Sequence, residues 1–358
     1  MSLEELFGIE LPVIQAPMAG VQGGALAIAV SNAGGLGSLP CAMLDAAAMR
    51  RELGAITAGT AQPFNVNFFC HAQPPFDAGR ERRWRETLAP YYQELDIDPA
   101  DIKPGPGRAP FDAAAADLLD EFKPAVVSFH FGLPRPDLLE RAKHCGAKIL
   151  GNATTVEEAR WLQAHGADAI IAQGFEAGGH RGMFLTDDPT TQIGTFALLP
   201  QIVAAVTVPV IAAGGIADAN GVAAALALGA AGVQVGTAYL LCPECTTRPV
   251  HRAALASQAA QCTALTNLFS GRLARGIVNR IIKELGPINP NVPAFPLAST
   301  ALAPLRAKAE SEGLGDFSPL WSGQNASRCK AVPAAVITRE LGTGRRPVLL
   351  NASINASE

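Results

Sequence analysis

The stretch PVIAAGGIADANGVAAALALGAAGVQVGTAYL, from Pro209 to Leu240, contains two apolar runs that lead into glycines, with a helical pattern between them. Neither run alternates apolar with polar residues, which is typical of parallel strands buried on both faces. The intervening segment, Asp218 to Gly229, has the length and apolar spacing of a helix. The stretch therefore predicts a strand–helix–strand unit of a parallel sheet.

The same unit recurs towards the N-terminus. Six further apolar runs are PVIQAPM from Pro12, LGSLPC from Leu36, FNVNFF from Phe64, AVVSFHF from Ala125, KILGNA from Lys148 and AIIAQG from Ala169. Eight such units predict an α/β fold, a closed (β/α)8 barrel of the TIM type over residues 1–241. In these barrels the chemistry takes place at the C-terminal ends of the strands.

The chain has 358 residues, more than the roughly 250 of a bare barrel. Residues 71–111 are rich in proline and too long for a βα loop, so we expect an insertion at the active-site face. Residues 242–320 are predicted to form a capping substrate domain, in which Thr263 to Ile282 looks extended. Residues 321–358 are expected to carry a C-terminal helix that packs on the barrel, and then a tail.

Composition excludes several classes of function. A formal net charge of −4 argues against a nucleic-acid partner, and no unbroken apolar run is long enough for a membrane span. The acidic N-terminus does not resemble a signal peptide, so a cytoplasmic protein is expected, as a monomer or homodimer. Seven cysteines without such a signal argue against a disulfide framework, and the CxxC of Cys242 and Cys245 reads as coincidence. No metal-ligand cluster or serine elbow is present, which disfavours a metal site.

The last two strand ends predict a phosphate-binding site. Gly214 and Gly215 end the seventh strand, and Gln234, Val235, Gly236 and Thr237 end the eighth. Loops at these positions of a barrel often bind phosphate through backbone N–H groups, which glycine lets approach closely. The alternative is that the glycines only terminate strands.

Other strand ends suit a flat ring. The backbone of Ala16, Pro17 and Met18 follows the first strand, and the amides of Asn67 and Gln173 lie at the tips of the third and sixth. Amides donate and accept, as an isoalloxazine edge requires, although each could merely satisfy loop backbone. With the phosphate site, these residues favour flavin mononucleotide (FMN).

His130 is the candidate catalytic residue. It ends the fourth strand, and alternation places Ser128, His130 and Gly132 on one side, towards the expected pocket. A neutral imidazole there takes up a proton at neutral pH, unless the ring is simply packed in the barrel and bonded to Ser128. His180, after the sixth strand, either contacts a ligand or shapes its loop. We expect the other histidines to be solvated: His71, His144, His165 and His251.

Eight segments together resemble class I nitronate monooxygenases, formerly called 2-nitropropane dioxygenases. They are QAPM (Gln15 to Met18), SNAGGLGS (Ser31 to Ser38), FNVNFFCH (Phe64 to His71), SFHFG (Ser128 to Gly132), AQGFEAGGHRG (Ala172 to Gly182), AAGGI (Ala212 to Ile216), QVGTA (Gln234 to Ala238) and SGRLARG (Ser270 to Gly276). The resemblance covers nearly the whole chain, and SFHFG with EAGGHRG is its most specific part.

The resemblance implies FMN, a capped barrel, and oxidation of small anionic alkyl nitronates by O₂ without NAD(P)H, giving a carbonyl compound and nitrite. It implies propionate 3-nitronate, a toxic metabolite, as substrate and detoxification as the role. It makes His130 the catalytic residue, and it places flavin contacts at Ala16 to Met18, Asn67, Gln173, Gly178, Gly179, Gly214, Gly215 and Gln234 to Thr237.

The chain departs from this family in its expected pocket. Family members carry tyrosines and a lysine there, whereas this chain has Phe295 and no lysine nearby before Lys308. We assign Ser128, His180 and Phe295 to the substrate pocket, and Arg272 or Arg275 are candidates to replace the lysine. Two other functions fit the same barrel: an NAD(P)H-dependent flavin reductase, acting on enoyl thioesters or quinones, and a non-enzymatic flavin-binding scaffold.

Overall fold

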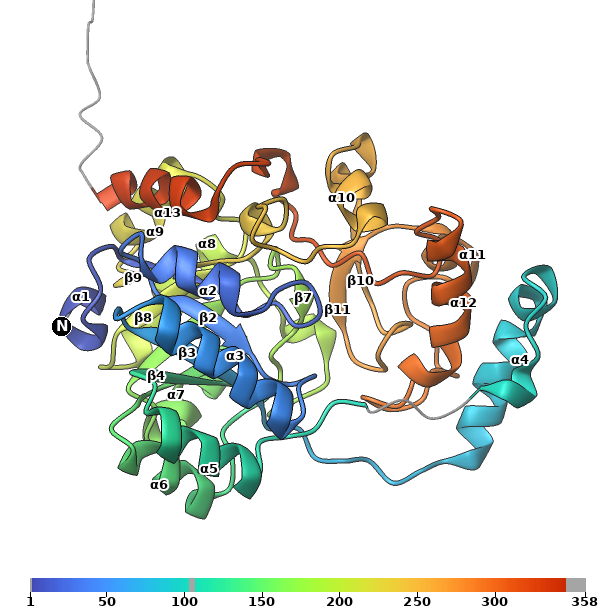
Figure 1. Ribbon diagram of the computed structural model, residues 1–358, viewed down its shortest axis with the longest axis horizontal. Coiled ribbons are helices and arrows are strands. Elements are labelled where there is room, and N and C mark those ends of the chain that lie inside the picture. Colours follow the sequence, from blue (N-terminus) through green and yellow to red (C-terminus); the bar gives the residue numbers. More distant parts are fainter. Residues whose placement is uncertain (1, 103–106, 346–358) are drawn as a thin grey trace, which may run out of the picture.

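The computed structural model describes residues 2–102 and 107–345, and within them eight parallel strands form a barrel (Figure 1). The strands are β1 Val13–Gln15, β2 Gly37–Pro40, β3 Phe64–Phe69, β4 Val126–His130, β5 Lys148–Ala153, β6 Ala169–Gln173, β8 Val210–Ala213 and β9 Gly232–Val235. Their order is β1-β9-β8-β6-β5-β4-β3-β2. A parallel bridge between Ile14 and Leu36 joins the two ends, so the (β/α)8 barrel is confirmed.

Helices surround this barrel, as alternation along the chain requires. They are α2 Gly24–Ser31, α3 Ala46–Gly59, α5 Ala113–Phe122, α6 Pro136–His144, α7 Val156–Ala164, α8 Thr195–Ala205 and α9 Ala219–Ala227. The short helix α1 (Leu3–Phe7) contributes Leu3 and Phe7 to the same buried cluster as Ile14 and Leu150 of the strands. This cluster fills the barrel interior, which leaves the opposite end for a site.

A second lobe stands beside the C-terminal ends of the strands (Figure 1). Its elements are α10 Pro249–Leu255, β10 Thr263–Thr266, β11 Ala274–Ile277, α11 Arg280–Leu285 and α12 Ser299–Ser311. The prediction that Thr263 to Ile282 is extended is wrong at its end, because α11 begins at Arg280. The apolar pair Ile281 and Ile282 is buried on a helix, and a short apolar run does not distinguish helix from strand.

The insertion after β3 belongs physically to this lobe. It contains helix α4 (Ala78–Glu94), whose Trp84 and Tyr92 share a buried cluster with Leu305 of α12. The Tyr92 hydroxyl donates a hydrogen bond to the Ala301 carbonyl at 2.7 Å. Helix α4 of the insertion therefore packs on the cap.

One antiparallel strand pair links the barrel to the cap. Strand β7 (Gly179–His180), in the loop after β6, pairs with β11 so that His180 lies opposite Ala274 and Gly179 opposite Arg275. Helix α13 (Ala334–Gly342) returns to the barrel next to α2 and α9, and Thr338 lies 2.9 Å from the Tyr239 hydroxyl. The end of the expected tail, residues 346–358, lies outside the described residues.

Short 3-10 helices complete the described chain: η1 Pro99–Asp101, η2 Pro189–Thr191, η3 Thr237–Tyr239, η4 Gln258–Gln261, η5 Ala326–Arg328 and η6 Thr343–Arg345. None of the helices described is both long and apolar enough to cross a membrane.

A pair of glycines tests the packing of the barrel. A Cβ added at Gly37 in β2 would lie 2.0 Å from the Ala27 carbonyl oxygen of α2, whereas one at Gly54 in α3 meets nothing within 4 Å. We expect Gly37→Ala to lower the free energy of unfolding by at least about 2 kcal/mol. Gly54→Ala should raise it by about 0.5–1 kcal/mol, because a helix interior favours alanine. Urea unfolding measures both; a Gly37→Ala protein as stable as the wild type would contradict this packing.

Candidate active site

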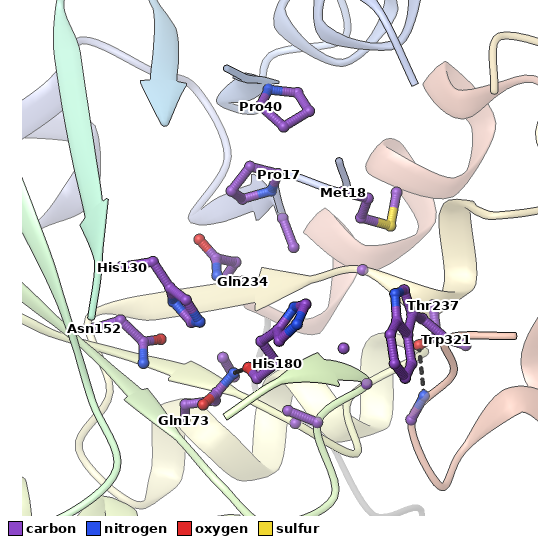
Figure 2. Close-up of a pocket in the computed structure, with 18 of the residues that line it drawn as sticks. Pro17, Met18, Pro40, His130, Asn152, Gln173, His180, Gln234, Thr237 and Trp321 are labelled. Carbon is purple, nitrogen blue, oxygen red and sulfur yellow. Dashed lines mark hydrogen bonds between the residues drawn. The ribbon is translucent and has the colours of Figure 1, made fainter. Parts of the chain in front are cut away.

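A large pocket lies where the C-terminal ends of the strands meet the cap (Figure 2). It holds about 1370 Å³ of empty space, part of it open to solvent. Most of the residues predicted from the sequence line it: Ala16, Pro17, Met18, Asn67, Ser128, His130, Gln173, Gly178, Gly179, His180, Gly214, Gly215, Gln234, Gly236 and Thr237. Residues from six different strand ends thus converge on one cavity, as the barrel requires.

Two predicted residues do not line this pocket. Val235 is 1% exposed and packs with Val13 and Leu26 between strands and helices, because alternation turns it away from the side that Gln234 faces. Its carbonyl accepts a hydrogen bond from Ala16 N at 2.8 Å, so Val235 holds the first strand end in place.

Phe295 stands beside the pocket, in an aromatic wall. Its ring centroid lies 5.4 Å from those of Phe131 and His180 and 6.2 Å from that of Phe69. Phe69 lines the pocket, so Phe295 supports that lining from behind. We call Phe69, Phe131, Phe295 and His71 the aromatic wall.

The imidazoles of His130 and His180 approach the same space from β4 and β7 (Figure 2). Burial, with a smaller contribution from the positive charge of Arg272, lowers the pKa of His130 to about 3. Burial, reinforced by Arg108, holds the pKa of His180 well below its usual value. Both rings are therefore neutral at physiological pH and can accept a proton or donate one N–H.

Ser128 does not hold His130 in place. The Ser128 hydroxyl oxygen lies 2.9 Å from the amide nitrogens of both Asn65 and Asn67 and accepts from them. His180, by contrast, has a fixed partner, because its Nε2 lies 2.8 Å from the hydroxyl of Ser270 in the cap. The His130 ring lines the pocket and contacts the backbone of His180, whereas the His180 ring ties its loop to the cap.

The pocket amides divide into two kinds. Gln173 donates to the His180 carbonyl at 3.0 Å and accepts from Gly182 N at 2.8 Å, which is the loop-supporting role left open as an alternative. Gln234 and Asn152 differ, because Gln234 Oε1 and Asn152 Nδ2 are buried and find no hydrogen-bond partner among the described residues. Unpaired buried polar atoms are costly, so a ligand that offers a donor and an acceptor could satisfy these two atoms.

The ends of β6, β8 and β9 form a cradle of close backbone. Gly214 and Gly215 have φ of 115° and 74°, and a Cβ at Gly214 would lie 2.9 Å from Thr195 Oγ1. A Cβ at Gly178 would lie 2.5 Å from Gly323 N, and this same N–H donates to Thr237 Oγ1 at 3.0 Å. We call Gly178, Gly214, Gly215 and Thr237 the glycine cradle.

An acidic side chain lies at this cradle. Glu176 accepts hydrogen bonds from Thr195 N and Thr195 Oγ1, both at 2.8 Å, at the start of α8. The N-terminal end of a helix stabilises a carboxylate, so part of its charge is offset before any ligand arrives.

Sequence reasoning missed several pocket residues: Arg108, Asn152, Glu176, His251, Trp321 and Asn325. Asn152 is the second-last residue of a predicted strand, and Asn67 likewise lies near a strand end, so the same reasoning could have found it. Trp321 and Asn325 follow the cap in sequence, and Asn325 donates to the Gly215 carbonyl at 2.8 Å. Nothing local in the sequence marks either as a pocket residue.

The expectation that His71 and His251 are solvated is wrong. Each is 5% exposed, because the insertion and cap fold over them. Burial lowers the pKa of each to about 4, while contacts with the backbone of Arg108 and of Trp321 oppose the shift. His144 and His165 are exposed on α6 and after α7, as expected.

Arg181 fixes the loop that carries His180. Its side chain is fully buried and donates to the carbonyls of Gly174 and Gln173 at 2.6 and 2.7 Å, and to Gln192 Oε1 at 2.9 Å. Charge-assisted hydrogen bonds of this kind are among the strong ones.

In residues 2–102 and 107–345, no three His, Cys, Asp or Glu side chains are grouped as metal ligands, and Cys242 and Cys245 are buried free thiols.

Comparisons with known proteins agree over nearly the full length. The sequence model of the family described as nitronate monooxygenase matches residues 1–341. Nitronate monooxygenases of Pseudomonas aeruginosa and Paraburkholderia phytofirmans are 44% and 43% identical, over 94% and 95% of this chain and 96% and 93% of theirs. The crystal structure of a nitroalkane oxidase from Streptomyces ansochromogenes superposes with a TM-score of 0.85 at 38% identity, over 96% of this chain and 99% of the other.

The buried histidines make stability depend on pH. In the unfolded chain they bind protons near pH 6.5, whereas in the folded protein His71, His130 and His251 stay neutral down to about pH 4 or below. Below pH 6.5 the unfolded state therefore binds more protons, and the free energy of unfolding falls as pH falls. We expect His71→Phe to reduce that slope by up to one proton. Urea unfolding from pH 7.5 to 4.5 gives the slopes; equal slopes in wild type and His71→Phe would refute the assignment.

Proposed function

The chain belongs to the nitronate monooxygenase family and is an oxidoreductase, and we propose that it uses FMN and O₂ to convert alkyl nitronates into a carbonyl compound and nitrite. The observation that carries the proposal is a single pocket with a glycine cradle and two neutral imidazoles. A cytoplasmic location and a monomeric or homodimeric state are further expectations from the sequence.

The residues present fit FMN. The glycine cradle offers close backbone for a phosphate, and the Ala16 to Met18 segment lines the pocket beside it. The unpaired Gln234 Oε1 and Asn152 Nδ2 supply an acceptor and a donor for the polar edge of a ring. When bound, FMN supplies the electron acceptor that organic side chains lack and that O₂ can reoxidise.

His130 has two tasks in this proposal. A neutral nitroalkane must lose its α-proton before it can be oxidised, and a buried neutral imidazole can accept that proton. A nitronate that arrives already ionised needs no base, and there the imidazole N–H can donate to the anion instead. The nearby positive charges of Arg272 and Arg181, which help lower the pKa of His130, also favour an anion beside it.

The proposed physiological substrate is propionate 3-nitronate, and the proposed role is its detoxification. Support comes from the family and from the pocket lining. Among the described residues that line the pocket, Glu176 is the only acidic one, so the lining carries little negative charge that would repel an anion. The cap and the aromatic wall restrict water around the site, which strengthens electrostatic interactions inside it.

The reaction is tested on the purified, FMN-loaded protein. We expect nitrite release and O₂ uptake from propionate 3-nitronate in air without NAD(P)H. Rapid bleaching of the flavin by NADH under anaerobic conditions, with no nitrite from the nitronate, would instead favour the flavin reductase. A colourless protein that takes up no FMN would favour the scaffold.

The role of His130 is tested with His130→Asn. We expect turnover of neutral nitroethane to fall by at least about 100-fold, which is the usual contribution of a positioned base. Oxidation of preformed ethyl nitronate should fall far less, and FMN should remain bound, because neither needs the proton transfer. His144→Asn, on the exposed end of α6, is the matched control. Undiminished nitroethane turnover in His130→Asn would exclude the assigned role.

A further inference from the structure

Arg108 is a cation in the pocket lining that the proposed chemistry does not use. It follows the insertion, lies half-buried, and reaches the pocket beside the aromatic wall. Its guanidinium carbon lies 5.7 Å from the centroid of the Phe295 ring. Among the described residues, no other arginine lines this pocket.

Arg108 has no counter-ion among the described residues, since no carboxylate oxygen there lies within 4.0 Å of its guanidinium. Its pKa is lowered by burial and then by the positive charge of Arg306. Arg306 is itself paired with Glu310 at 2.8 Å, whereas Arg108 is a partly desolvated cation without such a partner, which costs free energy unless an anion completes the site.

The neighbouring arginines are already engaged. Arg272 donates to the Met183 carbonyl and lies over the Phe131 ring at 4.2 Å. Arg275 donates to the Phe175 carbonyl at 3.0 Å and to Thr263 Oγ1 at 3.0 Å. Both were candidates for substrate recognition from the sequence, and neither lines the pocket. Arg275 Nη2 has no partner among the described residues, but of these three arginines Arg108 is the one that lines the pocket.

The residues around Arg108 are compatible with an anion bound to its guanidinium. The aromatic wall is uncharged, and its His71 ring, 4.8 Å from Phe295, is neutral at physiological pH because burial lowers its pKa to about 4. Glu176, the acidic lining residue, accepts hydrogen bonds from Thr195 at the glycine cradle. An anion at Arg108 would thus meet a cation and neutral rings.

We propose that Arg108 determines substrate specificity by binding a carboxylate at the end of the nitronate substrate that points away from His130. This inference rests on the proposed function and makes short nitronates with a terminal carboxylate the preferred class, above alkyl nitronates of equal length. The planar guanidinium matches a carboxylate in a two-point hydrogen bond, which a lysine does not reproduce.

A matched pair of substrates tests the proposal on the FMN-loaded enzyme: propionate 3-nitronate and propyl 1-nitronate, which share three carbons. In Arg108→Met the ratio of their kcat/KM values should fall by at least about 10-fold, mainly through the KM of the carboxylate substrate. Arg108→Lys should restore part of the ratio. Arg82→Met is the control, because Arg82 is 73% exposed on α4, and it should keep the wild-type ratio. An unchanged ratio in Arg108→Met overturns the proposal.

A binding measurement separates this proposal from the proposed function. Succinate carries two planar anions at the spacing of propionate 3-nitronate and does not react, so calorimetry can measure its Kd directly. We expect Arg108→Met to raise that Kd by at least about 10-fold and Arg82→Met to leave it unchanged. If the wild type oxidises neither nitronate, the proposed function fails while the succinate result still decides the role of Arg108. The proposed role of Arg108 would be overturned by equal Kd values for succinate in the wild type and Arg108→Met, by no succinate binding in the wild type, or by loss of FMN in Arg108→Met.

Discussion

The pairing of β7 with β11 is the contact on which the rest of the site depends. Two residues of a barrel loop, Gly179 and His180, form backbone pairs with Arg275 and Ala274 of the cap. Arg181 anchors the next position of that loop through the carbonyls of Gln173 and Gly174. Since backbone pairing fixes both position and orientation, the cap is held over the strand ends, and the barrel mouth becomes one wall of a pocket that is partly open to solvent.

Enclosure explains the electrostatics of the site. In water, the imidazoles of His130, His180, His71 and His251 would titrate near pH 6.5. Burial lowers all four pKa values, and the surrounding arginines lower several of them further. A cavity lined by neutral imidazoles and neighboured by cations suits an anion that must be held without being protonated. The same burial makes the folded state less tolerant of acid.

The sequence was most informative where chemistry and fold share a repeating unit. Strand ends such as Asn67, His130 and Gly214 could be placed at one face of the barrel, because parallel strands bring their C-terminal ends together. It was less informative about side-chain partners. Gln173 lines the pocket as predicted and also supports the loop backbone, whereas Val235 turns towards the helices. The approach of β11 and the helix shell decided these roles, and neither shows in the local pattern.

The amino-acid sequence by itself determined the barrel, the cradle of glycines and the position of His130, since these follow from apolar runs and residue types that recur at a fixed period. Only the tertiary structure decided that His71 and His251 are buried, that α4 joins the cap, and that Arg108 reaches the pocket. The physical reason is that burial and proximity across the insertion and cap arise from contacts between segments more than a hundred residues apart, such as Tyr92 with Ala301. No local periodicity records such a contact.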